Sequence, residues 1–455
     1  MENNIISTYV NQPTDKGVSV AKYCSLLHQS WADFRDERLR CKRYTYGQQW
    51  LDTITVGESK VTERRYIESE GQIPLQNNMI RKLVRSVVGV NTNRLDSSLS
   101  KRSAEQAKRD RQNGIRQFFS RAMEEFLISG LAVARVDYRG TPSRNHPSVG
   151  IGMVRPANFF FNRDACDPRG RDVNAVGQLL ILPVPVFAGM FATTPRDFNL
   201  FMKAYEGKEF VRVYEIWKLV TGERVTYHRP SDGKIMRVSL EEWNANRHLH
   251  NLPHHSALVR MWEYKYVTTE GVILREGDSP LPGGRHPFIF RAYPLIDSEI
   301  HSFVSDVIDQ QRYCNRLITA YDWILRSSAK GVLLIPEQTL RPGDDPSKIA
   351  KEWSRCNGVI PYIHTDGVPA PHQASAQGAN QGIDQLLQIE LKMMEDVSGV
   401  NAALQGRVAS TVKSGTMLDQ QTQNALTSLR DIIDTFEDFV DEWFSVESIF
   451  LGEEK

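Results

Sequence analysis

The segment that most constrains the fold of this chain is residues 298–330, SEIHSFVSDVIDQQRYCNRLITAYDWILRSSAK. Its apolar residues, from Ile300 to Leu325, recur at intervals of three and four, which returns them to one face of an α-helix every two turns. The pattern predicts a long amphipathic helix over 298–330, and the residues GVLLIPE directly behind it predict a strand. Because the segment carries no group typical of a catalytic site, we expect a structural part.

The opposite face of this predicted helix carries charged and polar residues of both signs. A solvated surface is the ordinary interpretation of such a face. The alternative is that many copies of the chain pack side by side, so that the face lines a wet channel or contacts a neighbouring subunit. The candidate residues for these two roles are Asp306, Asp309, Arg312, Asn315 and Arg316.

Size and composition limit the classes of protein that fit. A chain of 455 residues is too long for one hydrophobic core, so two or three subdomains are expected. The 56 basic and 55 acidic residues give a net charge of +1, which argues against tight binding of nucleic acid through phosphate neutralisation. The five cysteines include no CxxC pair, which favours a reducing compartment over a disulfide framework or a zinc site.

No segment has the pattern of a signal peptide or a membrane span. The N-terminus lacks a basic and then apolar stretch. The most apolar run, from Leu179 to Ala192, is shorter than the roughly 20 residues that a span needs, and Pro183 and Pro185 interrupt it. We therefore predict a buried strand and turn there, and no membrane partner.

The rest of the chain alternates between helical and β patterns, which predicts an α+β fold. Residues 211–294 have the alternation and turn signals of strands. The strand pattern LAVARVDY follows Gly130, where a helix should stop. Further helices are predicted at 19–42, 75–95, from the Thr194 cap, before Gly399, and at 416–450.

A basic segment at residues 101–121 could touch DNA phosphates, and the candidate residues are Lys108, Arg109 and Arg111. Acidic residues such as Glu105 are interleaved with these cations, so a solvated helix face is the favoured alternative.

The sequence indicates no catalytic residue, cofactor site or metal site. The chain lacks GxxxxGK[ST], HExxH, GxSxG and a dinucleotide fingerprint. Asp164 and Asp167 could bind a divalent cation, but NRDACDPRGRD is typical of turns. A histidine cluster in a proline-containing loop could hold a transition metal, although no cysteine or paired carboxylate stands nearby, which favours an exposed loop. Its members are His248, His250, His254 and His255.

Taken in order, the segments resemble the portal proteins of tailed bacteriophages, which form the ring at the capsid vertex through which DNA is packaged and ejected. The resemblance is carried by the order of segments over most of the chain. They are YTYGQQW, PLQNNMIRKLVRSVVGV, AMEEFLISGLAVARVDY, FNRDACDPRGRDVNAVGQLLIL, VRVYEIWK, HPFIFRAYPL with the helix behind it, and VSGVNAALQGRVASTVKSGTMLDQQTQ.

The resemblance implies a portal fold: an α/β wing, long stem helices, a β-rich clip and a C-terminal helical crown, assembled as a cyclic ring of twelve copies. The crown should be short, since the chain stops soon after its last long helix. The implied divisions are 1–210 as wing with a possible first stem helix, 211–297 as the β-rich region with the clip, 298–330 as a stem helix, 331–400 as a wing return with a possible tunnel loop at 340–382, and 401–455 as the crown.

The resemblance also implies the role and the partners. The protein would be a structural, non-enzymatic part of the virion, assembled in the host cytoplasm, without a cofactor. Its partners would be other copies of itself, the major capsid protein, the terminase large subunit, head–tail adaptor proteins and non-specifically bound double-stranded DNA. Two alternatives stay open: a nucleic-acid-processing enzyme subunit, with 101–121 as its DNA-binding face, and a head–tail connector protein other than a portal.

Overall fold

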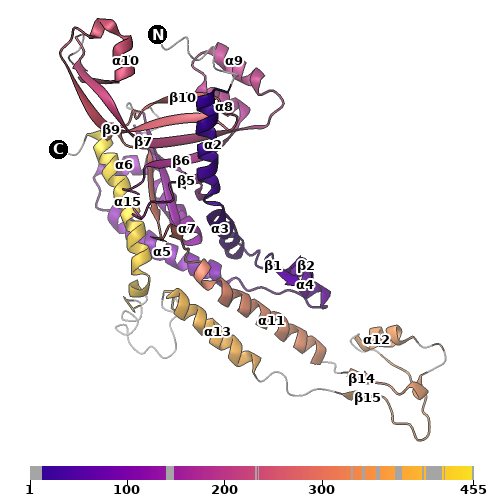
Figure 1. The fold of residues 1–455 in the computed structure, drawn as a ribbon. Coiled ribbons are helices and arrows are strands. Elements are labelled where there is room, and N and C mark those ends of the chain that lie inside the picture. The colour runs from indigo at the N-terminus through magenta and orange to yellow at the C-terminus, as the bar shows by residue number, and fades with distance from the viewer. Residues whose placement is uncertain are drawn as a thin grey trace. The chain divides into compact units, whose positions relative to one another are not determined.

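The computed structural model mixes helix and sheet, with 49% helix and 24% strand, which agrees with the predicted α+β class (Figure 1). The chain divides into two compact units. The first consists of Met1–Leu39, Val87–Phe303 and Leu429–Lys455, and the second of Arg40–Ser86 and Val304–Ser428. The structure describes residues 13–139, 148–230, 233, 235–328, 332–340, 343, 345–354, 359–374, 382–401, 404–405, 423–424 and 426–452.

The first unit is built around an antiparallel sheet in the order β10-β9-β7-β6-β5, with β8 on β7 (Figure 1). The long strands β7 and β9 pair from Val213 opposite Thr268 to Tyr227 opposite His254. This hairpin lies within the predicted β-rich region, so the prediction of strands there is confirmed. The strands are β5 (Phe159–Phe161), β6 (Ala175–Pro183), β7 (Phe210–His228), β8 (Ile235–Ser239), β9 (His254–Thr268) and β10 (Ile273–Asp278).

A smaller antiparallel sheet in the same unit has the order β11-β3-β4. Its strands are β3 (Leu131–Tyr138), β4 (Val149–Met153) and β11 (Phe288–Ala292). Aromatic side chains from both sheets share one core, in which Phe159, Phe161 and Phe290 are at most 2% exposed. Helix α2 (Asp15–Gln29) covers this core, and the next helix α3 (Ala32–Thr45) begins in the first unit and continues into the second.

The C-terminal helix α15 (Arg430–Leu451) belongs to the first unit and packs on α7 and β11. Its buried face includes Phe436, Phe439 and Trp443, all with 0% exposure. The rings of Phe436 and Phe439 meet Phe119 edge to face, at centroid distances of 6.4 and 5.9 Å. Sequence periodicity predicted this helix over 416–450; its described part starts fourteen residues later, and 416–422 lie outside the described residues.

The remaining helices of the first unit are α6 (Ala104–Asn113), α7 (Ile115–Ser129), α8 (Val184–Phe191), α9 (Pro195–Ala204) and α10 (Leu240–Ala245). The predicted start of α9 is confirmed, because Thr194 and Asp197 form a reciprocal capping box with proline at the first helical position. Helix α8 corrects the predicted strand and turn: the run from Leu179 leaves the strand at Pro183 and turns helical. Pro185 is tolerated since the first turn needs no N–H there.

The second unit consists mainly of helices. α5 begins in it and continues into the first unit. Its helices are the end of α3, α4 (Glu63–Ser69), α5 (Met79–Leu99), α11 (Ile308–Ser328), α12 (Pro346–Ser354) and α13 (Ile383–Ser398). Its strand pairs are β1 (Thr53–Val56) with β2 (Ser59–Thr62), and β14 (Val332–Leu334) with β15 (His372–Ala374). Within this unit α11 and α13 lie side by side (Figure 1).

The predicted helix over 298–330 is wrong at its N-terminal end. Residues 299–300 form strand β13 (Glu299–Ile300), which pairs with β12 (Pro294–Ile296), and residues 305–307 form a short 3₁₀ turn (Ser305–Val307). The α-helix α11 starts only at Ile308, and residues 329–330 lie outside the described part. The helical pattern continues into this region because Phe303, Val304 and Val307 are buried, at 0–5% exposure, although they precede the α-helix.

The predicted first helix, 19–42, is two helices. The helical conformation is interrupted at Ser30 and Trp31, between α2 and α3. There the buried Trp31 side chain donates from Nε1 to the Phe161 carbonyl at 2.8 Å. Within the described ranges, no helix is both long and apolar enough to cross a membrane.

We predict that Gly130→Ala destabilises the first unit. Gly130 ends α7 with φ of +74°, and an added Cβ would lie 2.5 Å from the His301 carbonyl oxygen. The left-handed backbone alone costs a non-glycine residue roughly 1–3 kcal/mol. Gly89→Ala is the control, because a Cβ there meets nothing within 4 Å and alanine favours the helix interior by about 0.5–1 kcal/mol. Denaturant unfolding measures both, and equal stabilities would contradict the argument.

Candidate functional site on helix α11

One side of α11 carries three buried polar side chains spaced four residues apart. Gln311, Asn315 and Thr319 are 0%, 1% and 2% exposed. A spacing of four keeps them in one row on the helix surface. We call this row the polar seam. Buried polar groups need hydrogen-bond partners, and these come from the chain ahead of α5.

Gln311 closes the start of α5. Its Oε1 accepts from the backbone N–H groups of Met79 at 2.9 Å and Ile80 at 3.2 Å, and its Nε2 donates to the Asn77 carbonyl at 2.7 Å. The first N–H groups of a helix have no partner inside the helix. Gln311 therefore supplies from α11 the cap that α5 needs, while Asn78 Oδ1 accepts from Arg81 N–H at 3.1 Å.

The other two seam residues hold the extended backbone before α5. Asn315 Oδ1 accepts from the Asn77 N–H at 3.1 Å, and its Nδ2 donates to Gln49 Oε1 at 2.6 Å. Thr319 Oγ1 accepts from the Leu75 N–H at 3.1 Å. The seam thus fixes the register between α11 and the entry to α5, side chain by side chain.

A buried carboxylate completes this side of α11. Glu63, the first residue of α4, has a side chain only 3% exposed. It accepts from Arg316 Nε at 2.6 Å and Arg312 Nη2 at 3.3 Å. An acid at a helix N-terminus is favoured by the helix dipole, and the two arginines compensate its buried charge.

The structure places the five candidate residues of the predicted stem helix in three different settings. Asn315 lies in the seam, and Arg312 and Arg316 pair with Glu63, although about half of the Arg316 side chain is exposed. Asp309 is 85% exposed, and Asp306 is exposed on the 3₁₀ turn before α11. A role for them in a channel or a subunit contact stays a prediction.

Sequence reasoning missed Gln311, Thr319 and Glu63. A signal for the first two was present, because polar residues at 311, 315 and 319 recur every four positions beside the apolar stripe. Glu63 lies 249 residues before Arg312 in the chain, and the sequence around Glu63 gives no indication of the pairing.

The predicted DNA-near residues lie on α6, where the structure separates them. Lys108 and Arg111 are exposed. Arg109 is only 14% exposed and lies 3.7 Å from Glu447 of α15. Its neighbour Arg102 donates to Glu447 at 2.7 Å, and burial raises the pKa of that carboxyl despite the arginines. Arg109 therefore helps to hold α6 on α15, and only Lys108 and Arg111 are placed to meet a ligand from solvent.

The most buried carboxylate with a shifted pKa also has a structural environment. Burial opposes ionisation of Glu215 on β7, but Arg135 on β3 holds its pKa below the ordinary value. The Glu215 carboxylate accepts from Arg135 Nη2 at 3.1 Å, from the Tyr266 hydroxyl at 2.9 Å and from Gln178 Nε2 at 2.6 Å. Every contact of this group is internal to the two sheets, so it links them and offers no reacting atom to a substrate.

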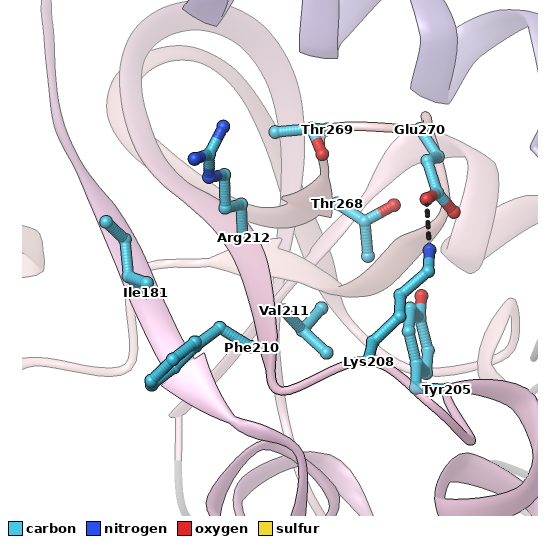
Figure 2. A pocket seen from close by; sticks show the side chains of 9 residues that line it. All are labelled: Ile181, Tyr205, Lys208, Phe210, Val211, Arg212, Thr268, Thr269 and Glu270. Carbon is cyan, nitrogen blue, oxygen red and sulfur yellow. Dashed lines mark hydrogen bonds and ion pairs between the residues drawn. The ribbon is translucent and has the colours of Figure 1, made fainter.

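A hollow of about 340 Å³ lies beside β6 and β7. Figure 2 shows the nine side chains that line it. Its charged pair, Lys208 and Glu270, is already joined at 2.7 Å, and Lys208 also lies over the Tyr205 ring. Phe210 and Ile181 give one wall an apolar surface. Among the nine lining residues there is no nucleophile held by a base, which makes catalysis a poor interpretation of the hollow.

Residues of the histidine cluster and of the acidic turn make contacts that stabilise the local fold. His250 hydrogen-bonds the Trp243 carbonyl at 2.8 Å and stacks on its ring, and His254 also contacts that ring. In the turn, Asp167 accepts from the Arg169 N–H at 2.8 Å. Over the described ranges, no three histidine, cysteine or acidic side chains gather as metal ligands would.

The sequence matches the family model for Phage P22-like portal protein over residues 26–445, most of the chain. The chain belongs to this family. A search of curated proteins gives no significant match. Membership identifies a phage portal, the head–tail connector at the capsid vertex, and the family is structural rather than enzymatic.

We predict that Asn315→Ala weakens the portal fold. The substitution removes the donor to Oε1 of the buried Gln49 side chain and the acceptor of the Asn77 N–H, and an unsatisfied buried group costs about 1–3 kcal/mol. Asp309→Ala is the matched control on the same helix, and as an exposed change it should stay within about 0.5 kcal/mol of the parent. Denaturant unfolding of the two variants tests the seam; similar stabilities would contradict it.

Proposed function

We propose that this protein is the portal of a tailed phage, a ring of twelve copies around a channel at the capsid vertex. The terminase large subunit drives double-stranded DNA through this channel during packaging, and the DNA leaves by the same route at ejection. The family match over residues 26–445 is the observation that carries the proposal. The ring and the partners extend beyond it.

The proposed parts follow the chain order. Residues 1–210 form the wing, with α5 as a possible first stem helix, and α11 is the stem helix within 298–330. The long β7–β9 hairpin within 211–297 forms the clip that docks terminase and later the head–tail adaptors.

The other proposed parts fall partly on residues that are not described. A loop within 340–382 reaches the lumen as a tunnel loop, and 401–455 form the crown. Residues 341–342, 344, 355–358 and 375–381 of the loop lie outside the described ranges, as do 402–403, 406–422, 425 and 453–455 of the crown.

The charge of the chain suits a channel for DNA. A duplex that must slide cannot be held by many phosphate contacts, because each one adds affinity. The net charge is only +1, so the chain has little excess positive charge with which to hold the phosphates. This near-neutral balance supports weak, non-specific contact with DNA.

Assembly is the direct test of the proposal. Native mass measurement and negative-stain imaging of the purified protein should show a closed ring of twelve copies with a central opening. The ring should lack nuclease and ATPase activity with Mg²⁺. A monomer that cleaves DNA in a Mg²⁺-dependent reaction would instead support the nucleic-acid-processing alternative.

We predict that Lys108→Glu with Arg111→Glu weakens the binding of duplex DNA to the assembled ring. Both side chains are exposed on α6, so reversing them removes two phosphate contacts. Affinity should fall, and the slope of log affinity against log salt should decrease by about 2. A filter-binding titration over several salt concentrations measures both quantities.

The matched control is Arg196→Glu with Lys203→Glu, an equal charge change at exposed positions of α9. Loss of affinity from both pairs alike would show a general charge effect and contradict a DNA-near position for α6.

A further inference from the structure

Helix α13 carries an apolar stripe that the described residues of its own unit leave uncovered. Leu386, Ile389, Met393 and Val397 are 42%, 51%, 50% and 49% exposed. Their spacings of three, four and four residues keep them within one narrow arc of the helix. We call them the α13 stripe. An uncovered row of large apolar side chains marks an interaction site.

The stripe is distinct from the side of α13 that packs inside the unit. Met394 and Ser398 are 1% and 4% exposed, and they follow stripe residues by one position, which is about 100° around the helix. Since α13 packs against α11, this buried side already has its partner. The stripe is therefore a second apolar face rather than an edge of the first.

Helix α11 has an uncovered face of its own. Tyr313 and Trp323 are 42% and 46% exposed. With Asp309, Arg316 and Ala320 they make a row at spacings of four, three, four and three, which we call the outer α11 face. The seam residues lie on a different side of the helix. Aromatic residues and arginine are enriched at protein interfaces, and the outer α11 face contains both.

Helices α13 and α11 also differ in charge. Helix α13 contains four acidic residues and one lysine, whereas α11 contains three arginines and two aspartates. Two of these arginines, Arg312 and Arg316, pair with Glu63 of their own copy, so α11 meets a neighbour without an excess of negative charge. An acidic helix with an apolar stripe therefore suits α11 better than it suits DNA.

We propose that the α13 stripe of one copy packs on the outer α11 face of the next copy. The proposal rests on the proposed function, in that it supplies the subunit contact of the portal ring. Two unlike faces on one chain form a heterologous contact, which repeats from copy to copy and closes when the rotation between copies divides a full circle. The same pair of helices then serves every contact around the ring.

Ile389→Asp tests the contact by placing a charge in the centre of the stripe. The concentration at which half of the protein is assembled should rise roughly 30-fold or more, as expected for a central interface residue. Gln388→Asp is the matched control: it adds the same charge at the adjacent exposed position, outside the stripe. The control should assemble like the parent, and circular dichroism should show both variants folded.

Cysteine pairing tests the same contact without disrupting it. In a Cys166→Ser background, Tyr313→Cys combined with Met393→Cys should give a ladder of cross-linked multimers on oxidation, resolved on a non-reducing gel. Tyr313→Cys combined with Gln388→Cys is the control and should give little. This experiment decides the matter if Ile389→Asp fails to fold.

The two proposals can fail separately. If the parent forms rings, yet Ile389→Asp assembles normally and no ladder appears, the α13 contact is wrong and the portal function stands. If the parent forms no ring under any condition, both proposals are overturned.

Discussion

The buried polar row on α11 is the interaction on which the second unit depends. Gln311, Asn315 and Thr319 bond to backbone groups of Leu75, Asn77, Met79 and Ile80, so they fix where α5 begins as well as how α11 is rotated. Apolar packing tolerates small rotations of a helix, but a row of directional hydrogen bonds does not. The rotation of α11 in turn decides which of its residues reach solvent and are available to a neighbouring copy.

The first unit is held together by different means. Its aromatic core and the Arg135–Glu215 link join two sheets, and α15 adds Phe436 and Phe439 to a second aromatic cluster with Phe119. Buried charges such as Glu447 and Glu215 face arginines of the same unit, and the residues that line the hollow beside β6 and β7 include no nucleophile held by a base. These features suit a family whose members are structural parts of a virion.

Sequence patterns predicted much of the fold but little of the site. The α+β class, the β-rich centre and the existence of α11 followed from periodicity, which reports which residues are buried. The helix prediction failed at residues 298–307, since the buried residues there are spaced as in a helix. The strand-and-turn prediction failed at α8, because a helix accepts proline in its first turn. Asn315 is among the candidate residues of the predicted helix, but its partners Asn77 and Gln49 are more than 200 residues away in the chain and could not be paired with it from one sequence.

An electron cryomicroscopy map of the assembled ring would show directly which side of α11 lies inside its own copy and which side contacts a neighbour. We predict that the polar seam stays inside each copy, with Asn315 on its own Asn77, while Tyr313 and Trp323 lie against α13 of the adjacent copy. A map with the seam opened toward a neighbour, or with the α13 stripe facing solvent in the closed ring, would contradict it.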